Sequence, residues 1–353
     1  MSQKQFDYLV FIGRFQPFHV GHQEVITKAL ELADKVVILV GSSNQPRNIK
    51  NPFSFAERKT MILNAYGFNT IPGDTNTDYK RLLIAPLRDQ KYNDQAWAAS
   101  VQNIVQGQIA TLGWTDKPRR GGLIGHAKDE SSYYLQMFPQ WELVEHSINE
   151  EVHATNMREI YFEANIRYLR DVVPDSTYRF LESFAHTGDY KALQAEQVFI
   201  RKYKKSWEAA PYAPTFLTCD AVVVQSGHVL LVKRGANPGK GLWALPGGFV
   251  NQGERIENAM LRELREETRL KVPEPVLRGS IKSKEVFDHP DRSLRGRTVT
   301  QAFHIELTSG KLPAVKGGDD AAQAKWVPLS FVREEEMYED HYQILTHFVG
   351  NVG

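Results

Sequence analysis

The chain of 353 residues carries 43 basic and 42 acidic side chains, and the net charge of +1 argues against a broad surface for nucleic acid or an anionic membrane. This length favours two domains over a single core. The one cysteine, Cys219, excludes an intrachain disulfide and fits a reducing cytoplasm. The first residues lack the apolar core of a signal peptide, and no apolar run reaches about 18 residues, so we expect neither export nor membrane insertion.

The N-terminal half alternates strand-like and helix-like patterns. Strands are predicted near 8–12, 35–40, 82–85, 122–125 and 143–144, and helices near 23–34, 54–66, 96–112 and 133–138. Ser54 and Glu57 have the spacing of a capping box, which opens the second of these helices. Such alternation predicts an α/β domain with a parallel sheet, whose ligands lie at the carboxyl ends of the strands.

A phosphate-binding arrangement is predicted at the end of the first strand. Gly13 ends the strand, and the segment RFQPFHVGH leads into a helix. Backbone N–H groups and the helix dipole face an anion at such a turn. His19 and His22 lie at this helix start, where imidazoles can donate hydrogen bonds to charge that develops on a phosphate.

The string GRFQPFHVGH resembles the nucleotidyltransferase signature of the adenylyltransferases, and its first seven residues are most similar to nicotinamide mononucleotide adenylyltransferases of archaeal type. A second motif of that family, Ile-Ser-x-Thr-x-x-Arg, is matched at 152–158, where Thr155 and Arg158 keep their spacing and His153 replaces the serine. The resemblance implies a Rossmann-like domain that transfers an adenylyl group from ATP to nicotinamide mononucleotide. The role of the serine does not carry over to His153.

The resemblance also implies roles for residues. The candidates are His19, His22 and Arg158 for catalysis, and Gly13, Arg14, Phe15, Arg47, Asp89, Trp97 and Thr155 for substrate binding. We expect the two histidines to contact the phosphates of ATP, and Arg14 and Arg158 to clamp the phosphate chain.

Other candidates carry a stated alternative. Trp97 is expected to stack on nicotinamide with Asp89 near it, and core packing is the alternative for the ring. Lys50 and Arg58 are weaker candidates, and Arg58 fits a surface arginine of a helix equally well. His126, Lys128 and Asp129 follow a predicted strand end, where we expect them to border adenine or the acceptor.

The texture of the chain changes after residue 200. The pattern from Ile160 to about Arg201 is helical with a break at Pro174, and a basic, aromatic stretch with prolines follows. We predict one domain over 1–185, a linker over 186–214 and a second domain over 215–353. The second domain is predicted to contain a hairpin at 221–224 and 228–232, a glutamate-rich helix, strands near 276–286, 297–307 and 324–327, and a helix near 334–349. This order favours an α+β sandwich.

Four glutamates surround the predicted helix of the second domain, and Arg262 lies beside them. They are Glu254, Glu263, Glu266 and Glu267. Positions three and four apart share a helix face, so the last three repel one another until a cation joins them. Mg²⁺ or Mn²⁺ reverses this effect, because these ions prefer carboxylate and phosphate oxygens.

The spacing of Gly248, these glutamates and Arg262 resembles the Nudix box of pyrophosphohydrolases. One position departs, because Arg269 stands where the family has a glycine, at a helix end where left-handed geometry is common. The resemblance implies that Glu263, Glu266 and Glu267 hold the metal with Glu254 in support. Glu266 is our candidate base, although the motif leaves the other glutamates open, and Arg262 is expected to orient a glutamate by an ion pair.

Both motifs together resemble a bacterial fusion of a nicotinamide mononucleotide adenylyltransferase and a Nudix ADP-ribose pyrophosphatase. The string 285–297 resembles the branch that hydrolyses ADP-ribose to AMP and ribose 5-phosphate. Arg292, Arg295 and Arg297 are candidates for phosphate contacts and Phe287 for stacking on a base, with a solvated loop as the alternative.

Two other interpretations stay open. The first domain would act on another acceptor, such as a pantetheine or flavin phosphate, or the Nudix domain would sense ADP-ribose as a regulator. The expected ligands are ATP, nicotinamide mononucleotide and ADP-ribose, with no nucleic acid and no membrane. Homo-oligomerisation is left open.

Overall fold

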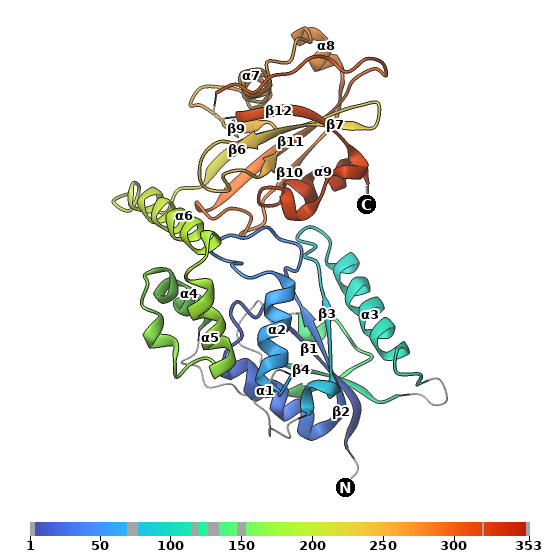
Figure 1. Ribbon diagram of the computed structural model, residues 1–353. Coiled ribbons are helices and arrows are strands. Elements are labelled where there is room, and N and C mark those ends of the chain that lie inside the picture. Colours follow the sequence, from blue (N-terminus) through green and yellow to red (C-terminus); the bar gives the residue numbers. More distant parts are fainter. Residues whose placement is uncertain are drawn as a thin grey trace. The chain divides into compact units, whose positions relative to one another are not determined.

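The computed structural model describes residues 4–68, 77–114, 119–125, 134–146, 153–319 and 321–350. Its contacts divide the chain into two compact units, Met1–Gln194 and Ala195–Gly353. Figure 1 shows the elements of each unit. Within the described ranges, no helix combines the length and the apolar character needed to cross a bilayer.

The first unit is built on a five-stranded parallel sheet in the order β3-β2-β1-β4-β5. Its strands are β1 (Phe6–Gly13), β2 (Ala33–Val40), β3 (Leu82–Pro86), β4 (Gly121–Gly125) and β5 (Glu142–Glu145). In the register, Gly13 lies beside Val40, and Val40 lies beside Pro86. The carboxyl ends of β1, β2 and β3 therefore meet at one edge of the sheet, and the predicted α/β alternation is confirmed.

Helices cover both faces of this sheet (Figure 1). They are α1 (Val20–Leu32), α2 (Phe55–Ala65) and α3 (Asp94–Ala110), with a 3-10 turn at Asp78–Arg81. Successive residues of a strand point to opposite faces, so Leu9 and Phe11 share a core with α1 and α2, whereas Val10 and Ile12 share a core with α3. Such burial on both sides is typical of a parallel sheet between helical layers.

A helical segment closes the first unit. It contains α4 (Ala154–Phe162), a 3-10 turn (Ile166–Leu169), α5 (Asp175–Phe184) and the start of α6 (Gly188–Lys205). Pro174 precedes α5 directly, so the predicted break at this proline is confirmed. Most of the predicted linker is helix α6, and from Ala195 onward this helix belongs to the second unit.

The second unit contains a mixed sheet in the order β10-β11-β6-β7-β12, with β8 paired to β7 and β9 paired to β6. Its strands are β6 (Phe216–Gln225), β7 (His228–Arg234), β8 (Trp243–Ala244), β9 (Gly247–Phe249), β10 (Ile281–Phe287), β11 (Thr298–Glu306) and β12 (Ala321–Pro328). Only β11 and β6 run parallel among these pairs. The hairpin β6–β7 is confirmed by its antiparallel pairing.

Besides the end of α6, the described helices of this unit are α7 (Ile256–Thr268), α8 (Glu274–Gly279) and α9 (His341–Val349), with 3-10 turns at Leu329–Phe331 and Glu334–Glu336. Two predictions about these segments need correction. The strand expected from residue 276 begins only at Ile281. The helix α8 precedes it, because a proline in the first turn of a helix is favourable. The helix expected from residue 334 begins at His341. Leu261 and Leu264 of α7 pack against Cys219 and Ala221 of β6.

Candidate active sites

His19 and His22 form a reciprocal cap at the start of α1. The backbone N–H of His22 donates to Nδ1 of His19 at 3.4 Å, and the N–H of His19 donates to Nδ1 of His22 at 3.3 Å. A backbone N–H only donates, so each Nδ1 is an acceptor and each neutral ring carries its proton on Nε2. Burial, and then the neighbouring His19, hold the pKa of His22 well below its usual range. The cap thus fixes the Nε2–H groups of both rings, which can donate hydrogen bonds to a phosphate.

Phe15 supports this pair from inside the protein. The residue has a positive φ of 53° and is only 1% exposed. Its ring lies edge-on to the ring of His22, with the centroids 4.8 Å apart. A Cβ at Gly13 would come within 2.9 Å of the Phe15 ring, so the approach requires a glycine. The ring of Phe15 is therefore packed in the interior, and the expected contact between Phe15 and substrate stays a prediction.

Arg158 ties the second motif to the loop after β1. Its guanidinium donates to the carbonyl oxygen of Gln16 at 2.8 Å and to Oγ1 of Thr155 at 3.1 Å. The side-chain amide of Gln16 in turn exchanges hydrogen bonds with the backbone of Phe53. Burial lowers the pKa of Arg158 to about 10, which leaves it cationic at pH 7. The structure thus brings the two motifs together, as the resemblance implies.

Arg58 is fully buried and holds the ends of two strands. It donates to the carbonyl oxygens of Arg14 at 2.7 Å, Gly41 at 2.6 Å and Ser42 at 3.2 Å. It is neither a surface arginine nor exposed to a ligand, so both expectations for it are wrong. The side chain of Arg14 is exposed at this edge and makes no ion pair with any residue that the structure describes.

The remaining N-terminal candidates have protein partners. Arg47 pairs with Glu57 at 2.6 Å and with Asp189 at 3.0 Å. Asp89 accepts hydrogen bonds from the N–H of Ser42 at 3.2 Å and from its Oγ at 2.8 Å. Trp97 is half-buried, with the rings of Tyr134 and Phe138 about its own at 5.9 and 6.0 Å. Its environment matches the alternative of core packing. His126, Lys128 and Asp129 lie outside the described residues.

In the second unit, Arg262 gathers three of the four candidate glutamates. Its guanidinium pairs with Glu254 at 3.0 Å, with Glu263 at 2.7 Å and with Glu266 at 3.0 Å. Helix α7 presents Glu263 and Glu266 on one face, as the spacing of the motif predicts, whereas Glu254 precedes the helix. At its C-terminal end Arg269 adopts left-handed geometry, with φ 50° and ψ 30°. The turn typical of glycine is therefore kept with an arginine.

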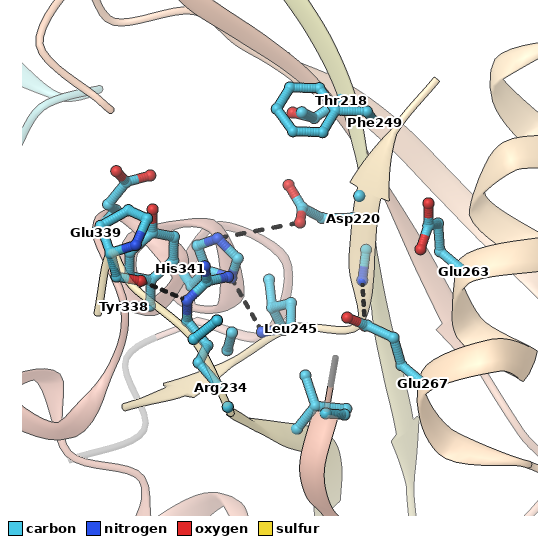
Figure 2. Close-up of a pocket in the computed structure, with 18 of the residues that line it drawn as sticks. Thr218, Asp220, Arg234, Leu245, Phe249, Glu263, Glu267, Tyr338, Glu339 and His341 are labelled. Carbon is cyan, nitrogen blue, oxygen red and sulfur yellow. Dashed lines mark hydrogen bonds and ion pairs between the residues drawn. The ribbon is translucent and has the colours of Figure 1, made fainter. Parts of the chain in front are cut away.

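Glu263 and Glu267 line a cavity of about 500 Å³ (Figure 2). The N–H of Gly247 donates to the carboxylate of Glu267 at 2.9 Å. Burial raises the pKa of Glu267 to about 8, and burial also raises the pKa of Glu263. A Cβ at Gly248 would lie 2.6 Å from the carboxyl group of Glu263, so this glycine leaves space for it. Two half-buried acids whose pKa values are raised by burial are suited to a divalent cation.

The acids do not yet form a complete ligand set. In the part of the chain that the structure describes, no three His, Cys, Asp or Glu side chains converge as a metal site. Arg262 forms ion pairs with Glu254, Glu263 and Glu266. Asp319, which the sequence interpretation missed, lines the same cavity, and its charge raises the pKa of Glu263 after larger effects from burial and neighbouring side chains.

The string 285–297 divides into separate environments. Phe287 is 2% exposed and packs edge-on against His347 and Phe348, so the prediction that it stacks on a base is wrong. Arg292 forms a buried bidentate pair with Asp340, at 2.9 and 3.0 Å. Arg297, predicted to bind substrate, is exposed and pairs with Asp288.

Arg295 differs from these neighbours. It lines the cavity and lies over the ring of Phe249, 5.0 Å from its centroid. Among the described residues no carboxylate lies within ion-pair distance of Arg295. Of the three predicted phosphate contacts in this string, this guanidinium is the one that faces the cavity without an acidic partner.

Helix α6 supplies another wall of the cavity. Phe199 and Tyr203 line it, and the ring of Tyr203 contacts Phe216 of β6 at 5.8 Å. The carboxylate of Glu196 accepts a hydrogen bond from the N–H of Gly239 at 3.1 Å. The sequence interpretation missed these residues because their segment was taken as a linker.

Comparisons with known proteins agree with two units of different chemistry. A cytidylyltransferase-like family model matches residues 10–160, and a NUDIX domain model matches residues 215–348. The nicotinamide/nicotinic acid mononucleotide adenylyltransferase of Acinetobacter baylyi is 43% identical over 191 residues, which cover 54% of this chain and 93% of that protein. The ADP-ribose pyrophosphatase of Methanocaldococcus jannaschii is 35% identical over 138 residues, which cover 39% of this chain and 75% of that protein.

A solved structure matches nearly the whole chain. The bifunctional NMN adenylyltransferase/ADP ribose pyrophosphatase from Francisella tularensis is 36% identical, with a TM-score of 0.88, and the match covers 99% of this chain and 100% of that chain. A second structure of that protein, complexed with AMP and Mn ion, matches to the same extent. The chain described here therefore belongs to the family of bifunctional NMN adenylyltransferase/ADP ribose pyrophosphatases.

Proposed function

We propose that the chain is a bifunctional enzyme of NAD metabolism. The first unit transfers an adenylyl group from ATP to nicotinamide mononucleotide, and the second hydrolyses ADP-ribose to AMP and ribose 5-phosphate. The observation that carries this proposal is the pair of unlike sites. One unit has imidazole and guanidinium groups at its sheet edge, and the other has carboxylates that line a cavity. The family membership supports the same assignment.

In the first unit, a phosphate oxygen of the acceptor forms a bond to the α-phosphorus of ATP, and the bond to the leaving pyrophosphate breaks. No protein nucleophile is needed, because the attacking group is already an anion, and positioning with charge neutralisation supplies the rate. The Nε2–H of His22 and the exposed Arg14 are suited to the phosphates, whereas Arg158 holds the loop that carries them.

In the second unit, water attacks a phosphorus of the diphosphate and the bridging P–O bond breaks. Glu263 and Glu267 would hold a divalent cation, which supplies charge neutralisation and a lowered pKa of water. Arg262 sets the carboxylates of Glu254, Glu263 and Glu266, and Arg295 offers an unpaired guanidinium for the diphosphate. Mg²⁺ is the ion we propose, and Glu266 remains the proposed base.

We keep the domains 1–185 and 215–353 with a connecting segment 186–214, supported by the ranges that the family models match. A cytoplasmic location is supported by the single, buried and free Cys219.

Reciprocal variants test the two activities. His22→Ala should lower NAD formation from ATP and nicotinamide mononucleotide by about 10²- to 10³-fold and leave ADP-ribose hydrolysis unchanged. Glu267→Gln should lower ADP-ribose hydrolysis by about 10²- to 10⁴-fold and leave NAD formation unchanged. Both products are quantified by chromatography with Mg²⁺. Loss of both activities in either variant would contradict two separate sites.

A further inference from the structure

A second polar group of the Nudix cavity lies apart from the glutamates of α7. Asp220 of β6 and His341 at the start of α9 are 5% and 7% exposed, and both line the cavity. Figure 2 shows their side chains pointing toward one another, with Glu263 and Glu267 standing apart from them beside α7. Oδ1 of Asp220 lies 4.0 Å from Nε2 of His341, which is too long for a hydrogen bond between them.

The protonation of His341 follows from its backbone partner. The N–H of Leu245 donates to Nδ1 of His341 at 3.0 Å. Nδ1 is therefore an acceptor, and the neutral ring carries its proton on Nε2, toward Asp220. Burial lowers the pKa of His341, which keeps the ring neutral at pH 7. The ring of Tyr338 contacts the imidazole edge-on at 5.5 Å and fixes its plane.

The carboxylate of Asp220 is also fixed by a hydrogen bond. Oγ1 of Thr300 donates to its Oδ2 at 2.6 Å, which leaves Oδ1 for the space toward His341. Asp340, which precedes α9, forms a buried ion pair with Arg292. This pair fixes the start of α9 as well. A donor and an acceptor thus face one gap on rigid elements.

The chemistry of this gap selects its occupant. A hydroxyl oxygen can accept from Nε2–H and donate to Oδ1 at ordinary lengths of about 2.8 Å, and so bridge the 4.0 Å separation. The diphosphate of a nucleoside diphosphate sugar is ionised and has no O–H to donate to the carboxylate, and an ammonium group cannot accept from the imidazole. We infer that Asp220 and His341 bind a sugar hydroxyl of the nucleoside diphosphate substrate and thereby set its specificity. This inference rests on the proposed hydrolysis of ADP-ribose.

Either ribose of ADP-ribose can supply the hydroxyl, and two analogues separate them. An alkyl ester of ADP lacks the terminal ribose, and ADP-ribose built on 2′,3′-dideoxyadenosine lacks the hydroxyls of the nucleoside ribose. The full chain should hydrolyse one of the two with kcat/KM lowered about 10- to 100-fold, the range expected for a hydrogen bond to a charged group. The analogue that loses activity identifies the ribose.

Substitutions at the pair then distinguish binding of the hydroxyl from a purely structural role, because only loss of binding depends on the substrate used. Asp220→Asn, which keeps the shape and an acceptor for Thr300, should lower kcat/KM for ADP-ribose by a similar factor but should not lower it further for the affected analogue. Thr300→Val, which only loosens Asp220, should give a smaller loss with the same dependence on substrate. Asp288→Asn, at an exposed aspartate, serves as the matched control, and Mn²⁺ binding by each variant verifies the fold.

Two results would overturn the inference. One is wild-type protein that hydrolyses both analogues as well as ADP-ribose, and the other is an Asp220→Asn variant that loses the same factor on all three substrates. Wild-type protein that hydrolyses none of the three would overturn the proposed function, and the inference with it.

Discussion

The two units organise their sites with the same type of residue but expose opposite charges. In the first unit, buried Arg58 and Arg158 donate to backbone carbonyls and fix the loop that carries His19 and His22. In the second, Arg262 donates to three carboxylates and fixes the acids themselves. An arginine is therefore a scaffold in both sites, and its partner decides the chemistry. Carbonyl partners leave the site cationic, whereas carboxylate partners leave it ready for a cation.

Removal of the buried scaffold in the first unit should have the largest effect. Arg58→Ala leaves three carbonyls at the strand ends without a donor, and each buried unsatisfied group costs about 1–3 kcal/mol. We expect the free energy of unfolding of this unit to fall by about 3–5 kcal/mol, measured by calorimetry. The matched variant Arg167→Ala, at an exposed arginine, should stay within about 0.5 kcal/mol. Equal losses in the two variants would contradict the scaffold role.

Removal of the scaffold in the second unit should affect the metal more than the fold. Arg262→Ala leaves Glu254, Glu263 and Glu266 without their shared cation, and loss of such an orienting partner costs about 10- to 100-fold in metal affinity or activity. Mn²⁺ titration and ADP-ribose hydrolysis measure both. Arg265→Ala is the control on the same helix, because Arg265 pairs with Glu274 instead. Unchanged Mn²⁺ affinity in Arg262→Ala would refute this role.

The aromatic wall from α6 should contribute less. Tyr203→Leu removes a ring that lines the cavity, and aromatic contacts contribute about 0.5–1.5 kcal/mol beyond burial, so KM for ADP-ribose should rise about 2- to 10-fold with kcat nearly unchanged. Tyr212→Leu, at a tyrosine that is 85% exposed, should leave KM unaltered. The same KM in both variants would exclude α6 from the binding of substrate.

Titration of Glu267 should change the protons bound at the metal site by close to one. Burial raises its pKa to about 8 in the fold, above the value of 4.5 for an unburied side chain, so the metal-free unit loses stability as pH rises from about 4.5 through 8. A bound cation stabilises the carboxylate, so Mn²⁺ binding at pH 7 should release nearly one proton. Calorimetry in buffers of different ionisation enthalpy measures the release. Glu267→Gln should abolish it, and an unchanged release would contradict the assignment to Glu267.

Local sequence determined much of each site, because its key residues lie within one helix or one turn. The positions of Glu263, Glu266 and Arg262 follow from helical spacing, and those of His19 and His22 from the start of a helix after a strand. Groups brought together from distant segments were missed. Asp220 and His341 lie on β6 and α9, and no sequence pattern in either segment predicts that the two come together.

Burial was the other property that sequence could not supply. Arg58 stands in a helix whose pattern permits a surface arginine, yet carbonyls from two strand ends surround its guanidinium. Phe287 lies in a charged string, and its ring nevertheless packs with His347 and Phe348 of α9. Tertiary contacts determined the burial of both side chains. The difference in charge between the two sites depends on such contacts as well.

The most direct test of the contrast is a pair of crystal soaks, one in manganese chloride read by an anomalous difference map and one in pyrophosphate read by an ordinary difference map. The account predicts a Mn²⁺ peak beside Glu263 and Glu267 in the second unit, and a pyrophosphate bound by His22 and Arg14 in the first. No ion at these carboxylates in the first map, or no anion at the imidazoles in the second, would contradict it.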